Sequence, residues 1–223
     1  LLEARKIDGG EQFFSRANDF GYSKNPEETL QIWDKEKVLA DLVWTIRKFQ
    51  PDVIINRFDH RSPGTTHGHH TSSAMLSIEG FDLANNAASF PEQLQLVKPW
   101  QPKRVFFNTS WWFYGSKEKF DSADKTNLVS VSTGTYYSTL GKSNQEIASL
   151  SRSSHKSQGF GSTGSRGEDT EYLEYLKGTP LKDKSSIFEG IDTSWNRVKG
   201  GKPIGELITA ITNQYDFKNP SAS

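Results

Sequence analysis

Residues 50–56 read Gln-Pro-Asp-Val-Ile-Ile-Asn, and they separate a long amphipathic segment from a polar loop. The proline ends the preceding helix because it has no amide hydrogen and its ring blocks the helical turn. The run 53–56 is short, apolar and β-branched, as in a strand buried on both faces of a parallel sheet. Upstream, Asn25 can cap a helix that starts at Pro26, and apolar side chains recur at roughly helical spacing at Leu30, Trp33, Val38, Leu42, Ile46 and Phe49. Helix, tight loop and buried strand in succession predict an α/β fold.

The rest of the chain continues this alternation of helices and strands. A helix is expected from Thr66 to about Ala88, with its inward face formed by Ala74, Ile78, Phe81 and Ala84. Further expected elements are strands at 103–108 and 129–137, helices at 141–152, 171–176 and 204–211, and a Gly/Ser-rich loop at 156–170. The prediction is therefore a mostly parallel sheet flanked by helices.

Composition excludes several classes of protein. The 27 Lys and Arg residues balance the 27 Asp and Glu residues, so the chain lacks the basic field of a non-specific nucleic-acid binder. No stretch approaches the roughly 18 apolar residues of a membrane span. The sequence contains no cysteine, which excludes disulfides, thiolate metal sites and cysteine nucleophiles. Aromatic residues make up 12% of the chain, which favours a folded domain over a disordered one.

Four of the five histidines lie within the segment 60–70, in and just after the polar loop that follows the predicted strand. His67 and His70 are three positions apart, so on a helix they share a face. That arrangement suits a metal ligand beside a second functional imidazole. His69 should point away from them. The alternative is that these side chains only satisfy local hydrogen bonds, and the pattern alone gives half a metal site.

Other candidate residues lie in loops beyond the predicted strands, where ligands of open α/β sheets bind. Arg57 and Arg61 could hold a substrate carboxylate or phosphate, or be solvent-exposed charges. Asp59 could be a ligand, a partner of an imidazole or an ordinary turn residue. Trp111 and Trp112 could stack on sugar rings or belong to a packed aromatic cluster.

Three stretches resemble the PIG-L (LmbE-like) deacetylase family. The run 52–56, followed by a polar loop and Thr66-His67-Gly68-His69-His70, resembles the second half of that domain. Residues 148–158, which contain His155-Lys156-Ser157-Gln158, resemble a late family helix with a similar ending. A weaker match joins 3–6 and 18–21 to the family's helix and Asp-Gly loop. The resemblance covers about residues 1–160.

Known members of this family remove N-acetyl groups from amino sugars, using zinc on a Rossmann-like fold. The resemblance implies that His70 is a zinc ligand and that His67 stabilises the oxyanion of the tetrahedral intermediate. His155 matches a family motif without a defined role, and a helix-end cap is its alternative. The residues expected to bind substrate are Arg57, Asp59, Trp111, Trp112 and His155.

The family's His-Pro-Asp-Asp motif, which carries the other zinc ligands and the general base, has no counterpart here. We therefore expect a Rossmann-like domain truncated at its N-terminus, with residues 1–190 forming a partial deacetylase domain and 191–223 an extension. The expected function is a zinc-dependent N-deacetylase of an amino sugar or glycoconjugate that is inactive as this piece alone. The alternatives are a non-catalytic carbohydrate-binding module on the same scaffold and a plain structural domain. A glycan-directed, cysteine-free protein also fits export.

Overall fold

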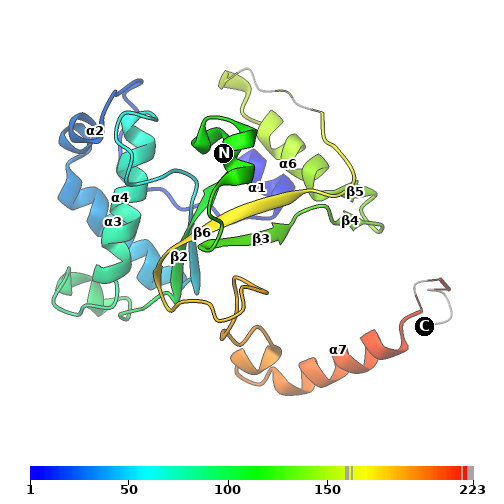
Figure 1. Cartoon of the computed structure of the whole chain (residues 1–223). Helices are drawn as coiled ribbons and strands as arrows, with labels where there is room; N and C mark the ends of the chain where they lie inside the picture. Colours follow the sequence, from blue (N-terminus) through cyan, green and yellow to red (C-terminus); the bar gives the residue numbers. More distant parts are fainter. Residues whose placement is uncertain (159–160, 162, 217, 220–223) are drawn as a thin grey trace.

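The computed structural model describes residues 1–158, 161, 163–216 and 218–219 (Figure 1). Its α-helices are α1 (Leu2–Asp8), α2 (Pro26–Trp33), α3 (Lys35–Phe49), α4 (Gly68–Leu83), α5 (Lys117–Ser122), α6 (Asn144–Ser153) and α7 (Lys202–Gln214). Its strands are β1 (Val53–Asn56), β2 (Arg104–Thr109), β3 (Leu128–Ser132), β4 (Tyr136–Tyr137), β5 (Lys142–Ser143) and β6 (Thr170–Gly178). Short 3-10 helices are η1 (Pro91–Gln95), η2 (Trp111–Tyr114), η3 (Lys156–Gln158) and η4 (Trp195–Arg197).

The main sheet has the strand order β1-β2-β6-β3. Strand β1 runs parallel to β2, and the connection between them carries α4, as the sequence predicts. Strand β6 lies antiparallel to both β2 and β3. The chain is thus α/β, but the expectation of a mostly parallel sheet is wrong for the described strands. The reason is the reversed strand between β2 and β3.

That strand, β6, lies where the sequence predicts a short helix at 171–176. The run Glu-Tyr-Leu-Glu-Tyr-Leu combines good helix formers with apolar residues three positions apart, which mimics a helical face. Pairing on both edges overrides this local preference. Leu173 is 5% exposed and packs between Phe106 of β2 and Val129 of β3. Tertiary contact therefore decides the conformation of this segment.

The predicted helix over 26–49 is present as two helices. Asn25 accepts a hydrogen bond from the backbone amide of Glu28, and Pro26 is the first helical residue, as expected. The chain then breaks at Asp34, whose φ of 57° lies in the left-handed region that aspartate tolerates better than most residues. The main helical core lies beyond the break, where α3 packs on α4 through Val38, Leu39, Val43, Ile46 and Leu76.

A buried arginine fixes the far end of α4. Arg47 of α3 is 1% exposed. Its guanidinium donates hydrogen bonds of 2.8–3.4 Å to the backbone carbonyls of Leu83, Ala84, Asn86, Ser89 and Phe90 and to the side chain of Gln93. Burial lowers the pKa of Arg47, yet an arginine remains charged. This side chain thus binds the carbonyl of Leu83, the last residue of α4, that of the C-cap residue Ala84 and three carbonyls of the turn that follows. Carbonyls at the end of a helix have no partner within the helix.

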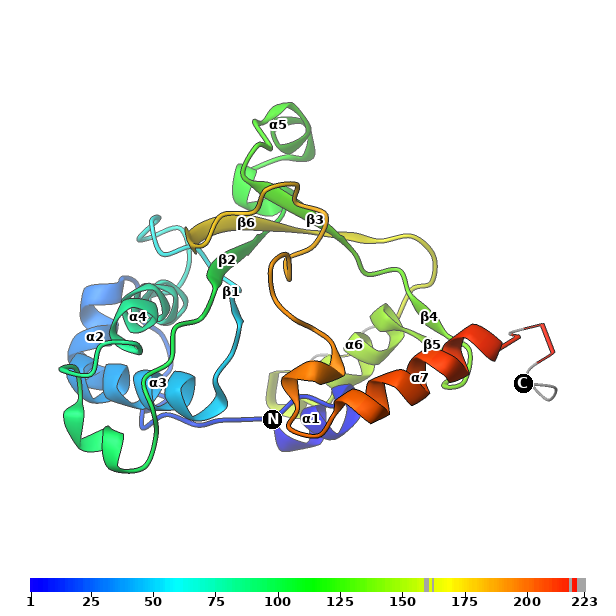
Figure 2. The same ribbon diagram turned by 90° about the horizontal axis from the view of Figure 1, so that it is seen from below.

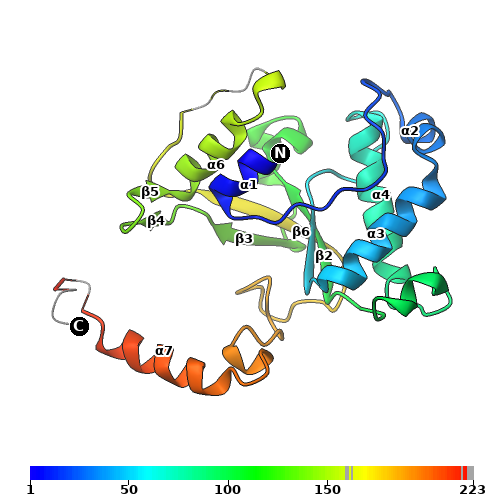
Figure 3. The same cartoon turned by 180° about the vertical axis from the view of Figure 1, so that it is seen from behind.

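Two helical groups lie on either side of the β1–β2 pair (Figures 2 and 3). One group is α2, α3 and α4, and the other is α1 packed on α6. Ser143 and Glu146 form a capping box that starts α6, consistent with the predicted helix. The predicted strand 129–137 is divided into β3 and β4, and β4 pairs with β5 in a separate two-stranded sheet. Within the expected loop 156–170, residues 159–160 and 162 lie outside the described residues.

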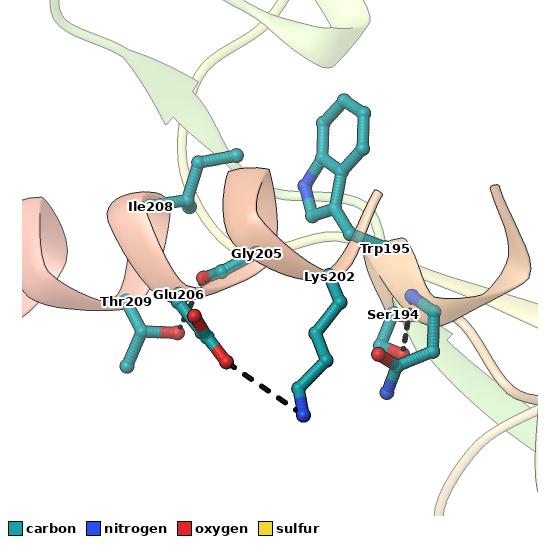
Figure 4. A pocket seen from close by; sticks show the side chains of 8 residues that line it. Ser194, Trp195, Lys202, Gly205, Glu206, Ile208 and Thr209 are labelled. Atoms are coloured by element: carbon teal, nitrogen blue, oxygen red, sulfur yellow. Dashed lines mark hydrogen bonds and ion pairs between the residues drawn. The ribbon is translucent and has the colours of Figure 1, made fainter. Parts of the chain in front are cut away.

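Helix α7 contains the predicted helix 204–211 but lies apart from the sheet and the other helices (Figures 1 and 3). None of its described residues is buried. A surface pocket between α7 and Trp195 is lined by side chains of both (Figure 4). Within the described part of the chain, no helix has the length and hydropathy needed to cross a membrane.

Candidate functional site

The start of α4 is held against α2 by a glycine. The amide of Gly68 donates a 3.0 Å hydrogen bond to the carbonyl of Ser23. A Cβ atom at position 68 would lie 2.2 Å from the carbonyl oxygen of Asn25, a distance at which atoms overlap, so a side chain does not fit without movement. This close approach fixes the position of the first turn of α4 and of its histidines.

His67 and His70 lie side by side, as their spacing predicts. Their ring centroids are 5.3 Å apart and the ring planes differ by 11°. The ring of His70 also stacks on Phe58, with centroids 3.7 Å apart and 6° between the planes. Tyr22 meets His67 edge-on at 4.9 Å. Two imidazoles are thus held by aromatic neighbours at the N-terminal end of α4, next to the loop that leaves β1.

The environment of His70 favours a neutral ring. Burial lowers the pKa of His70, and the nearby charges of His67 and His69 lower it further. Burial likewise lowers the pKa of His60, which Asp59 opposes from 3.6 Å between Nδ1 and Oδ1. A neutral imidazole can donate through one ring nitrogen and accept or bind a metal through the other.

His69 contacts a different set of residues, as expected. Its ring stacks on Phe20 at 4.5 Å and meets Trp33 at 5.5 Å. Its Nδ1 atom lies 3.1 Å from the hydroxyl of Ser23. His69 thus helps to pack the loop before α2.

Asp59 organises the loop between β1 and α4. It accepts hydrogen bonds from the backbone amide and the Nε of Arg61, and from the hydroxyl of Ser62. Burial would raise the pKa of Asp59, but these hydrogen bonds together lower it. Arg61 also binds both carboxylate oxygens of Glu174 in β6, at 2.8 and 2.7 Å. Asp59 is therefore a turn residue that also neighbours His60, and the donors of Arg61 are engaged within the protein.

The five residues expected to bind substrate fall on two cavities. Asp59, Trp111 and Trp112 line one cavity of about 400 Å³. The two indoles are 53% and 54% exposed, so they are not buried in a cluster, although Phe113 beside them packs on Phe107.

Arg57 and His155 line a second, larger cavity of about 800 Å³. Phe58, which sequence reasoning missed, lies between this cavity, the first one and the histidine pair. It stacks on His70, meets Phe113 edge-on at 6.4 Å, and lies with its ring centroid 5.9 Å from the guanidinium of Arg57. Its signal in the sequence is an aromatic residue in an otherwise polar loop.

The described residues do not form a complete zinc site. A catalytic zinc ion usually has three protein ligands and an open position. Within residues 1–158, 161, 163–216 and 218–219, no group of three or more His, Asp or Glu side chains is placed to hold a metal ion. The pair His67 and His70 supplies two imidazoles and no carboxylate.

Comparisons with known proteins find no matching family model and no matching curated protein.

Proposed function

We propose that this chain supplies part of a zinc-dependent N-deacetylase that acts on an amino sugar or glycoconjugate. The observation that carries the proposal is the pairing of His67 and His70 at the start of α4, beside the loop that leaves β1. The proposal also draws on the resemblance of 52–56 and 66–70 to PIG-L deacetylases.

In this proposal the two imidazoles have different roles. His70 would be the zinc ligand contributed by this chain, and its lowered pKa leaves the ring free to bind a metal at neutral pH. His67 is exposed and could direct an N–H at the oxyanion that forms when an amide is attacked. The other ligands and the general base are not supplied by the described residues.

A Zn²⁺ titration of this chain, followed by the imidazole resonances in NMR, tests the ligand assignment. Zn²⁺ should shift the resonances of His67 and His70 before those of His60 and His155. His70→Ala should weaken Zn²⁺ binding about tenfold or more, because the site has only two imidazoles and the variant removes one of them. His155→Ala is the matched control and should leave the affinity unchanged. An unchanged affinity in His70→Ala would exclude the zinc role of that residue.

Activity is tested in a polypeptide that contains this chain together with the further ligands and the base that the proposal requires. There, His67→Ala should lower the rate of acetate release about 100-fold or more, as expected for loss of an oxyanion-stabilising group. An intact polypeptide that binds zinc but releases no acetate from N-acetylated amino sugars would contradict the deacetylase proposal.

A specific observation favours a second candidate, a non-catalytic carbohydrate-binding module. Trp111 and Trp112 line the 400 Å³ cavity and are 53% and 54% exposed, and exposed aromatic rings can stack on sugars. For such a module, glycan binding would persist after metal removal and would be lost in the Trp111→Ala, Trp112→Ala double variant. Unchanged glycan binding in that variant would exclude it.

A further inference from the structure

Helix α7 presents an apolar face to solvent. Ile204, Leu207, Ile208 and Ile211 lie at helical spacing on one side of the helix, and all four are exposed. We refer to these four side chains as the α7 stripe. Most of the stability of a helix in a protein comes from packing such a face against a partner. The α7 stripe is therefore a surface that association would bury.

Helix α7 is fixed to its neighbour η4 before any partner binds. At Gly201, the N-cap of α7, a Cβ atom would lie 2.2 Å from the carbonyl oxygen of Trp195. The close approach of η4 to the helix therefore requires glycine at this position. Arg197, in η4, forms an ion pair of 2.6 Å with Asp52, which lies just before β1. A helix that is already held in place loses less conformational freedom when it associates.

The charged side chains of α7 lie away from the stripe. Figure 4 shows Ile208 and the indole of Trp195 on one side of the helix, and Lys202 and Glu206 on the other. These two are the charged residues of α7, so the side-chain charge of the helix is zero. The stripe can thus contact another surface without burying a charge. A lipid surface fits this helix poorly, because helices that lie on membranes carry many Lys and Arg side chains on their polar face.

The α7 stripe has the same spacing when it is followed from either end. Leu207 and Ile208 form its centre, Ile204 lies three positions before Leu207, and Ile211 lies three positions after Ile208. When a second α7 lies antiparallel across a two-fold axis at this centre, Ile204 meets the partner's Ile211 and Leu207 meets the partner's Ile208. Each contact then occurs twice, as a two-fold interface requires. The stripe is therefore complementary to a second copy of itself.

Electrostatics favour the antiparallel arrangement. The backbone dipoles of a helix leave partial positive charge at its N-terminus and partial negative charge at its C-terminus. An antiparallel pair places each positive end beside the negative end of the partner helix, whereas a parallel pair places like ends together. The whole chain carries 27 basic and 27 acidic residues, so two copies meet without repulsion between net charges.

We propose that two copies of this chain associate through antiparallel pairing of their α7 helices across the α7 stripe. Interfaces of standard size bury about 800 Å² per partner, and their dissociation constants range from micromolar to picomolar. One pair of helices buries less, so we expect a dissociation constant of about 10 μM or more. In dilute spectroscopic experiments the chain would then be monomeric. The pairing does not involve His67 or His70 and does not depend on the deacetylase proposal.

Sedimentation equilibrium of the full chain, from about 1 to about 300 μM, tests the association. The mean mass should rise from 25.1 kDa towards twice that value. Leu207→Lys places a charge at the centre of the stripe and should raise the dissociation constant about tenfold or more. Leu96→Lys is the matched control, because Leu96 is also an exposed leucine and lies outside α7. A mass of one chain at every concentration, or equal weakening by both variants, would overturn the proposal.

Cross-linking tests the direction of the pairing. The chain has no cysteine, so introduced thiols report only on the chosen positions. Ile204→Cys mixed with isotope-labelled Ile211→Cys, treated with a short bismaleimide, should give mixed dimers about tenfold faster than either variant alone gives like dimers. Mass spectrometry separates the two kinds. Faster formation of like dimers would show parallel pairing, and equal rates would show random collision. Either result would overturn the proposal.

Discussion

Helices α4 and α7 have similar lengths but differ in burial. Helix α4 packs against α2 and α3, and eight of its residues are buried. None of the described residues of α7 is buried, although it carries an apolar stripe at Ile204, Leu207, Ile208 and Ile211 with exposed fractions of 44%, 61%, 40% and 56%. Apolar periodicity therefore predicts both helices but does not predict whether a partner covers the apolar face.

The largest expected effect concerns the anchored end of α4. Arg47→Met should lower the free energy of unfolding by about 3–5 kcal/mol, because several buried carbonyls lose their donor at once. Chemical denaturation with urea, followed by circular dichroism, measures the change. The neighbouring exposed Lys48→Met should change stability by less than about 0.5 kcal/mol. A small effect of Arg47→Met would mean that α4 does not depend on this arginine.

A pair of leucines compares the two helices directly. Leu76 of α4 is 3% exposed and Leu207 of α7 is 61% exposed. Leu76→Ala should cost about 2–4 kcal/mol through lost burial and a residual cavity, whereas Leu207→Ala should stay within about 0.5 kcal/mol. The same denaturation experiment measures both. Equal losses would show that α7 is packed in solution as tightly as α4.

The smallest effect concerns the contact between α1 and α6. Each of these helices has fewer buried residues than α4 and more than α7. Asp8 forms an ion pair with Arg5 and accepts a 2.7 Å hydrogen bond from the hydroxyl of Ser151 in α6. Asp8→Asn removes a carboxylate whose pKa is lowered to about 2 by these contacts. A carboxyl with a lowered pKa stabilises the folded state above its unfolded pKa and loses that contribution as the pH falls through the folded value. The variant should therefore be less stable than the parent by up to about 1 kcal/mol at neutral pH. This difference should shrink below a pH of about 4 and vanish near 2. A difference that is constant with pH would contradict the ion pair.

Local sequence signals predict most of the helices and the first strands. Asn25 and Pro26 mark the start of α2, and the apolar run 53–56 marks β1, because these effects act within a few residues. The break at Asp34 is not visible, since the apolar stripe continues across it. The segment 170–178 shows where local reasoning fails. Its conformation depends on two partner strands that lie far away in the sequence. Because this segment forms an antiparallel strand, the prediction of a mostly parallel sheet is also wrong.

The candidate site divides in the same way. The closeness of His67 and His70 follows from their spacing of three positions at the start of α4, where His67 is the N-cap residue and His70 lies in the first turn. The engagement of Arg61 by Glu174 depends on β6 and could not be predicted. The stacking of Phe58 on His70 requires the loop to fold back on α4. The zinc and deacetylase assignments remain proposals because no third ligand lies with the two histidines among the described residues.

The central position of β6 also has a consequence for the order of folding. During synthesis, β6 leaves the ribosome after β1, β2, β3 and the helices α2–α4. Until then, the edge of β2 and the apolar side chains of β3 have no strand to pair with. Phe106 of β2, Val129 of β3 and Leu173 of β6 form one buried cluster in the folded chain, which cannot be complete before β6 is synthesised. Such non-local pairing is intrinsically slow, and we expect the unpaired strands to be the stage most exposed to chaperones and to aggregation.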